Sequence, residues 1–205
     1  MKTVFHPLQK ISWIEGYYKQ LKAVDDARKN KEHVFFFEHE NVITLGTSSK
    51  KKDIPETKKT RKSGIGVFQA SRGGEATWHG EGQLVVYPVL NIKKRKIQAP
   101  RLVEKILRTI QEALFKMDIE THLDLKNPGL YINNKKIASF GMTIKKGITL
   151  HGVSININNN QRGFEEIKPC GKSPKTMSTI QRETKRSTNI QLAAMEIKKS
   201  LSRTL

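Results

Sequence analysis

The chain has 205 residues, of which 36% are hydrophobic, and this length is within the range of one domain that buries its own core. Its 38 Lys and Arg against 19 Asp and Glu give a formal charge of +19. No stretch is long and apolar enough to span a membrane, and one cysteine can supply neither an internal disulfide nor a zinc finger. No apolar leader core precedes Pro7. We therefore expect a single cytoplasmic domain, residues 1–205.

The basic residues come in short runs that are spread along the chain and do not form one helix or tail. The runs are Lys50–Lys52, Lys58–Lys59, Lys93–Lys96 and Lys145–Lys146. Such charge is typical either of a solvated surface or of a protein that meets nucleic acid, an anionic membrane or an acidic protein. The chain shows no nucleic-acid-binding motif, so we expect neither nucleic acid nor a membrane as its partner.

In the first half of the chain, apolar spacing predicts two helices and several short strands. Residues Ile11–Asn30 have one apolar face, and Arg101–Met117 carry the clearest amphipathic stripe, with Pro100 just ahead. The polar, basic stretch Thr47–Ser63 is expected to be a loop. The strands expected in this half are His33–Phe37, Asn41–Leu45, Gly66–Ala70 and Leu84–Leu90.

The second half is richer in strands. Turns are expected at Asn133–Lys135 and Lys145–Gly147, and a loop at Arg162–Lys175. Thr188 and Asn189 can cap a final helix that runs through Leu201. The strands expected here are Gly129–Ile132, Lys136–Ile144 and Ile148–Ile157. Helices at the start, middle and end of a strand-rich chain predict an α/β (α+β) domain.

The single cysteine, Cys170, lies between Pro169 and Gly171 and is flanked by Lys168 and Lys172. No apolar pattern surrounds it, so it reads as a loop residue. A free cysteine is usually a small buried hydrophobe, but neighbouring positive charge favours the thiolate. From these residues alone, a reactive thiol and a structural one are about equally supported.

Three further segments carry polar groups in a glycine-rich or strand setting. Arg72–Gln83 has four glycines in twelve positions, which lets the backbone approach a ligand closely, although a plain glycine-rich hairpin is the alternative. It lacks the Walker and dinucleotide-binding patterns. Lys136 falls on the apolar side of its strand, but an edge lysine at a turn is the more common reading of that spacing. His151 is either functional or a satisfied core histidine.

Taken together, five segments resemble the lipoyl(octanoyl) transferases over about residues 33–180. The segments are Glu38–Gly46, Arg72–Gln83, Lys136–Gly141, Thr149–Gly152 with Asn156, and Pro169–Gly171 followed by Met177–Ile180. Two residues depart from the family pattern: Glu81 stands where proline is usual, and Leu150 where histidine is frequent. The resemblance implies the fold of lipoate-protein and biotin protein ligases, a mixed sheet flanked by helices.

The resemblance also implies roles for particular residues. Cys170 would take the acyl group as an enzyme thioester, and Lys136 would lower its thiol pKa and move protons. The donor would be octanoyl-acyl carrier protein, and the acceptors the lipoyl domains of 2-oxoacid dehydrogenases and the glycine cleavage H protein. The residues implied as walls of the acyl site are Arg72, Gly73, Gly74, Glu75, Ala76, Thr77, Trp78, His79, Ser139, Phe140, Gly141, Gly152, Val153 and Ser154.

A thioester donor is already activated, so we expect no ATP, no other cofactor and no metal. Acyl carrier proteins are acidic, which gives the +19 charge a partner. Two alternatives remain. An ATP-using lipoate ligase on the same fold would need an adenylate site and would not depend on Cys170. A non-catalytic basic binding protein could also keep the fold.

Overall fold

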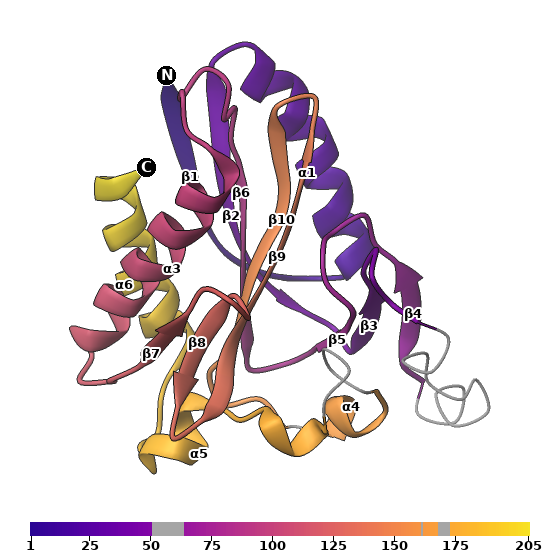
Figure 1. Ribbon diagram of the computed structural model, residues 1–205, viewed down its shortest axis with the longest axis vertical. Helices are drawn as coiled ribbons and strands as arrows, with labels where there is room; N and C mark the ends of the chain where they lie inside the picture. The colour runs from indigo at the N-terminus through magenta and orange to yellow at the C-terminus, as the bar shows by residue number, and fades with distance from the viewer. Residues whose placement is uncertain (51–63, 161, 168–172) are drawn as a thin grey trace.

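A computed structural model describes residues 1–50, 64–160, 162–167 and 173–205. Within them, one seven-stranded mixed sheet forms the centre of the molecule (Figure 1). In spatial order its strands are β1 (Lys2–Ile11), β2 (Lys31–His39), β6 (Gln83–Val89), β10 (Ile148–Asn156), β9 (Lys135–Lys145), β8 (Gly129–Ile132) and β7 (His122–Asp124). Of these pairings, β1–β2 is parallel and the others are antiparallel.

A second, three-stranded sheet carries the glycine-rich segment. Its strands are, in order, β4 (Gly66–Gln69), β3 (Val42–Leu45) and β5 (Ala76–His79). β3 pairs with β4 in parallel and with β5 in antiparallel fashion. Because β5 leads within a few residues into the central strand β6, the small sheet is fixed close to the middle of the large one (Figure 1).

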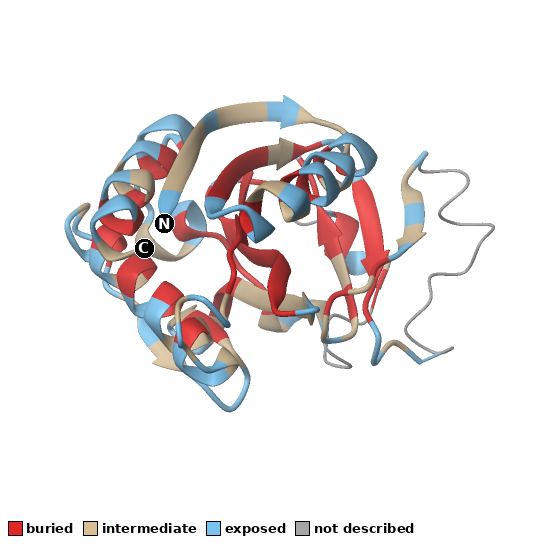
Figure 2. Cartoon of the chain, turned by 90° about the horizontal axis from the view of Figure 1, so that it is seen from above, coloured by how far each residue is buried: buried red, intermediate tan, exposed pale blue. Residues whose placement is uncertain are grey.

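Helices cover the two faces of the large sheet. α1 (Trp13–Arg28) lies against β2, β6 and β10 on one face, while α3 (Ala99–Phe115) and α6 (Ile190–Thr204) pack on each other at the opposite face (Figure 1). The strands between these layers are the most buried part of the chain (Figure 2). The expected α/β fold, a mixed sheet flanked by helices, is therefore confirmed. In the described ranges, no helix combines the length and apolarity needed to cross a bilayer.

Local sequence explains the ends of these elements. The Ser12 side chain accepts from the Glu15 backbone N–H, and the Glu15 carboxylate accepts from the Ser12 backbone N–H. This capping box starts α1. Asn189 caps α6, as expected, by accepting from two backbone N–H groups. Asn133 and Asn134 adopt positive φ angles of 48° and 61° in the β8–β9 hairpin, the conformation that two-residue turns of this kind require.

Two expectations about secondary structure are wrong. The sequence pattern predicts no element before Ile11 and a helix from there on, but Lys2–Ile11 form β1 and the helix begins at Trp13. Pro7 fits in β1 because this strand lies at the sheet edge. The loop expected at Arg162–Lys175 contains a short helix, α4 (Arg162–Glu165), and a 3₁₀ turn begins at Pro174 (Pro174–Thr176). Phe164 anchors α4 because its ring packs against Trp78. A further short helix, α5 (Ile180–Thr184), precedes α6. Residues 51–63 of the expected basic loop lie outside the described residues.

One buried ion pair ties the first strands to the segment after β6. The Glu32 carboxylate, fully buried on β2, accepts from Arg95 Nε at 2.9 Å and from the Asn91 backbone N–H at 2.7 Å. Arg95 Nη2 also donates to Thr3 Oγ1 on β1 at 3.0 Å. These contacts connect three segments that are far apart in sequence.

We predict that Glu32→Ala lowers the free energy of unfolding by about 3 kcal/mol, because it leaves a half-buried guanidinium and a buried N–H without their acceptor. Urea titration would measure the loss. Glu104→Ala, which removes an exposed pair with Arg108, is the control and should cost about 0.5 kcal/mol or less. Equal losses in the two variants would contradict the prediction.

Candidate active site

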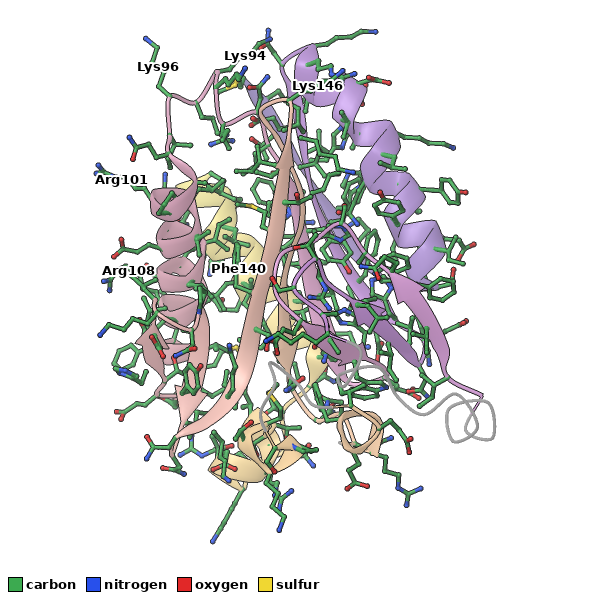
Figure 3. The ribbon with its side chains drawn as sticks, turned by 45° about the vertical axis from the view of Figure 1, so that its right-hand side comes forward. Lys94, Lys96, Arg101, Arg108, Phe140 and Lys146 are labelled. Carbon is green, nitrogen blue, oxygen red and sulfur yellow. The ribbon has the colours of Figure 1, made fainter. Side chains whose placement is uncertain are left out.

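A pocket with about 500 Å³ of space, part of it open to solvent, lies where the small sheet meets β6, β9 and β10. Figure 3 labels one of its residues, Phe140 on β9. The pocket is lined by Arg72, Gly73, Gly74, Glu75, Ala76, Thr77, His79, Val85, Tyr87, Lys136, Ser139, Phe140, Gly141, His151, Gly152, Val153 and Ser154. Four segments from separate parts of the chain thus build one cavity.

Most residues implied as the acyl site lie in this lining, together with Lys136. Trp78 differs: it is buried on the other side of β5, where its ring meets Phe164 edge-on with the centroids 5.2 Å apart. Its neighbours along the strand, Thr77 and His79, line the pocket, as alternation along a strand requires. Val85, Tyr87 and His151 also line the pocket, and the sequence did not assign the first two.

The glycine-rich segment is held between the two sheets by backbone bonds. The Thr47 N–H donates to Arg72 O at 3.0 Å on the small-sheet side, and the Gly73 N–H donates to Met142 O of β9 at 3.3 Å. Gly74 has a φ of +82°, which a residue with a side chain rarely adopts. The backbone of this segment therefore forms the bridge over the pocket.

Arg72 lines the pocket and also holds two segments of the chain together. Its guanidinium donates to Thr44 Oγ1 from Nε at 3.1 Å, to Thr44 O from Nη2 at 2.6 Å and to Gly73 O from Nη1 at 3.0 Å. The side chain is buried. It fixes β3 to the glycine-rich segment.

Lys136 is buried, with 9% of its surface exposed. Its Nζ donates to Asn127 O at 3.2 Å and lies 5.5 Å from the centre of the Tyr131 ring. The side chain is therefore buried, and the edge-lysine reading, which periodicity alone favoured, is wrong. Cys170, together with residues 168–172, lies outside the described residues. Beyond them, Met177 forms a bridge with Lys136, and the Ser178 N–H donates to Lys136 O at 3.0 Å.

A chain of buried side-chain hydrogen bonds runs behind the pocket. His79 Nδ1 meets Gln83 Oε1 at 2.7 Å, Gln83 Nε2 donates to Asn156 Oδ1 at 2.8 Å, and Asn156 Nδ2 donates to Ser178 O at 3.0 Å. All four residues are buried. The chain joins the glycine-rich segment to β6, β10 and the backbone beside Lys136. Sequence reasoning missed Gln83 and Asn156 as parts of one network, although both stood in the motifs.

Three histidines around the pocket are held neutral by burial. Desolvation lowers the pKa of His79 to about 3, and that of His39 to about 4. Burial and the nearby Arg72 cation lower the pKa of His151 to about 4. His151 is not simply a satisfied core residue, because it lines the pocket in a left-handed conformation with φ of 62°. Its backbone N–H donates to Gln20 Oε1 at 2.7 Å.

The two departures from the expected family pattern lie away from the pocket lining. Glu81 is exposed and pairs with Lys10 at 3.0 Å. Leu150 is buried in β10. Across the described ranges, no group of three or more His, Cys, Asp or Glu side chains is placed to hold a metal ion. The pocket combines glycine backbone, apolar walls and a buried lysine, a set that suits an acyl chain next to a group that moves protons.

Comparison with known proteins agrees with this description. Residues 17–202 match the model of the lipoyl protein ligase A/B catalytic domain. An octanoyltransferase of Buchnera aphidicola is 38% identical over 149 residues, which cover 73% of this chain and 68% of that protein. One from Shewanella baltica is 36% identical over 159 residues, covering 77% and 71% of the two chains.

Solved structures show the same fold at low sequence identity. A lipoate-protein ligase A bound with ATP has a TM-score of 0.78 at 15% identity, covering 100% of this chain and 85% of that one. The ligase of an archaeal lipoylation system from Thermoplasma acidophilum gives 0.76 at 15%, covering 100% and 84%. A biotin protein ligase from Aquifex aeolicus gives 0.54 at 16%, covering 100% and 68%.

The fold is the one that lipoate-protein ligases and a biotin protein ligase share. The chain belongs to the lipoyl protein ligase A/B catalytic domain family and, within it, to the octanoyltransferases. It is accordingly an acyltransferase.

We predict that stability falls as pH drops from about 6.5 to about 4. In the unfolded chain the imidazoles take up protons near their usual pKa of 6.5, whereas folded His39 and His151 resist until about 4 and His79 until about 3. The unfolded state then binds more protons in this window, which favours unfolding.

Urea titrations at pH values between 4.5 and 7.5 would measure this slope. His39→Gln, which keeps polar atoms near Ile11 O and the Tyr87 hydroxyl, should make the slope shallower. A slope that His39→Gln leaves unchanged would exclude this imidazole as a contributor.

Proposed function

We propose that this enzyme transfers an octanoyl group from octanoyl-acyl carrier protein to a lysine of a lipoyl domain, through a thioester on Cys170. The observation that carries the proposal is the pocket itself, which is lined by the glycine-rich segment, the Ser139–Gly141 part of β9, the Gly152–Ser154 part of β10 and Lys136. The octanoyltransferase relatives support the acyl group, and the acidic donor suits the charge of +19.

The proposed transfer has two balanced steps. The Cys170 thiolate attacks the carbonyl carbon of the donor thioester, the bond from that carbon to the donor sulfur breaks, and the departing thiolate takes a proton from Lys136. The acceptor amine then attacks the enzyme thioester, the bond to the Cys170 sulfur breaks, and an amide forms. The excess proton of the amine returns to Lys136, which restores the starting ion pair.

The walls of the pocket offer apolar surface to an acyl chain. Val85, Tyr87, Phe140 and Val153 supply apolar surface, and each buried methylene contributes about 0.8 kcal/mol. A Cβ at Gly152 would collide with Val86 O and with the Pro88 ring, so the floor of the pocket depends on this glycine. Since a thioester donor is already activated, the reaction needs no ATP.

The test is an acyl-enzyme assay without ATP. Incubation with octanoyl-acyl carrier protein should add one octanoyl group to Cys170, detected by mass spectrometry of the intact protein and of the peptide. Cys170→Ala should lose both the adduct and transfer to a lipoyl domain while keeping its thermal midpoint. Near-normal transfer by folded Cys170→Ala would refute the nucleophile.

Lys136→Ala should slow acyl-enzyme formation and raise the apparent pKa of the Cys170 thiol, because the ammonium that favours the thiolate is removed. The rate of iodoacetamide alkylation of Cys170 as a function of pH would measure this shift. Lys135→Ala is the matched control, since Lys135 Nζ lies at the surface and donates to Lys175 O at 2.7 Å. Identical alkylation profiles in wild type and Lys136→Ala would rule out this role.

We further predict that transfer from the carrier protein weakens as salt rises, through a higher apparent KM, because exposed charges are screened over about 8 Å at physiological ionic strength. A small octanoyl thioester lacks an acidic surface and should respond much less. Equal salt dependence of the two donors would show that the charge serves another purpose.

The basic run Lys93–Lys96 is one candidate docking site, and the other, Lys50–Lys52, lies mostly outside the described residues. Lys94, Lys96 and Lys146 lie at one end of the molecule (Figure 3). Lys94 Nζ already donates to Arg28 O at 2.7 Å and Asn30 Oδ1 at 2.8 Å. Neutralisation of Lys96 therefore tests docking with less structural damage than neutralisation of Lys94.

A further inference from the structure

The hydrogen-bond chain behind the pocket fixes the orientation of two side-chain amides. Ser178 O is a carbonyl and can only accept, so the atom of Asn156 that faces it is the nitrogen, 3.0 Å away. Trp78 O likewise requires the nitrogen of Gln83, at 3.2 Å. The same Gln83 nitrogen donates to Asn156 Oδ1 at 2.8 Å. Turning either amide would place oxygen against carbonyl oxygen.

This orientation leaves Gln83 Oε1 facing His79 Nδ1 at 2.7 Å. An amide oxygen accepts and does not donate, so Nδ1 carries the hydrogen. With a pKa lowered to about 3 by burial, the ring is neutral at pH 7, and a neutral imidazole has one N–H. His79 Nε2 is therefore a bare acceptor.

The residue that carries this acceptor atom lines the pocket. His79 lines the cavity with only 5% of its surface exposed, whereas Gln83, on the Nδ1 side of the ring, does not line it. In the ranges that the structure describes, Nε2 makes no hydrogen bond. His79 thus presents an acceptor without a protein donor to the lining of the pocket, where a ligand group with an N–H or O–H can bind it.

Of the two substrate groups that meet in the second step of the proposed transfer, only one brings such hydrogens to the acyl carbon. The octanoyl thioester offers an apolar chain and a carbonyl oxygen, neither of which donates. The attacking group is a primary amine with two N–H bonds. We propose that His79 Nε2 accepts a hydrogen bond from the amine of the incoming lysine and aims its lone pair at the thioester carbon, with Gln83 and Asn156 as positioning residues that set the His79 tautomer.

This inference rests on the proposed octanoyl transfer, and it assigns His79 to the second step, in which the amine attacks the enzyme thioester. As the amine nitrogen bonds to the acyl carbon and the bond from that carbon to sulfur breaks, one amine proton goes to Lys136. The other N–H is retained in the product amide, and it is this N–H that His79 holds. His79 itself neither gains nor loses a proton.

Nitrogen-15 NMR of the imidazole rings tests the tautomer in the wild-type protein, with His79→Gln to assign the signals. We expect His79 to stay neutral between pH 5 and pH 8 as the Nδ1–H form, since its pKa is about 3. Gln83→Leu should remove this preference. An Nε2–H tautomer, or an imidazolium at pH 7, in the wild-type enzyme would overturn the proposal.

Rapid-quench kinetics test the role. A small octanoyl thioester loads the enzyme, and lipoyl domain is then added, so that acylation and aminolysis are timed separately. His79→Asn keeps an amide near Nδ1 but has no atom at Nε2, whereas the longer amide of His79→Gln reaches that position. We expect His79→Asn to slow aminolysis about tenfold or more beyond any effect on acylation, and His79→Gln to recover part of the loss.

The outcomes separate this inference from the proposed function. If the wild-type enzyme forms no acyl-enzyme, the proposed function fails and the inference fails with it. If the acyl-enzyme forms and His79→Asn slows both steps equally, or neither, the proposed function stands and the inference is overturned. His122→Asn, at an exposed position on β7, is the control and should leave both rates unchanged.

Discussion

The buried hydrogen-bond chain from His79 to Ser178 is the constraint on which the rest of the pocket depends. Each polar group in it is cut off from water, and one left unpaired would cost about 1–3 kcal/mol. Loss of any single link therefore penalises its neighbours as well. Because the chain passes through Gln83 on β6 and Asn156 on β10, the central strands set where the glycine-rich segment lies. Ser178 carries the same constraint to the backbone of Lys136.

The same burial decides where charge is allowed in the pocket. His39, His79 and His151 would all be cations at low pH in water, yet desolvation keeps them neutral in the fold. A wall of neutral rings and glycine backbone costs little to place against an octanoyl chain. The free energy of unfolding falls below about pH 6.5 as a consequence, because the unfolded chain gains protons that the folded protein does not bind. An apolar binding site and acid sensitivity thus share one cause.

Periodicity predicted the amphipathic helix α3, the capped helix α6 and most strands, because each of these buries one face or lies wholly in the core. It failed at β1, where Pro7 and the exposed lysines Lys2 and Lys10 suit an edge strand but weaken the signal. Trp78 could have been removed from the expected acyl site, since alternation puts it opposite His79. The Gln83–Asn156 hydrogen bond joins residues 73 positions apart, and a pattern of neighbouring residues cannot predict a contact over that separation.

The two cations that line the pocket differ in what they can do. Arg72 donates hydrogen bonds to Thr44 and Gly73, and a guanidinium does not lose its proton near neutral pH. Arg72 therefore contributes a permanent positive charge and holds the backbone in place. A lysine ammonium differs from a guanidinium because it can lose its proton and take it back. The transfer that we propose needs one proton delivered to a leaving thiolate and one withdrawn from an amine, and we assign that task to Lys136. The arginine holds the glycine-rich segment in place, and in the role that we propose for it the neutral imidazole of His79 orients the amine without competing for the proton.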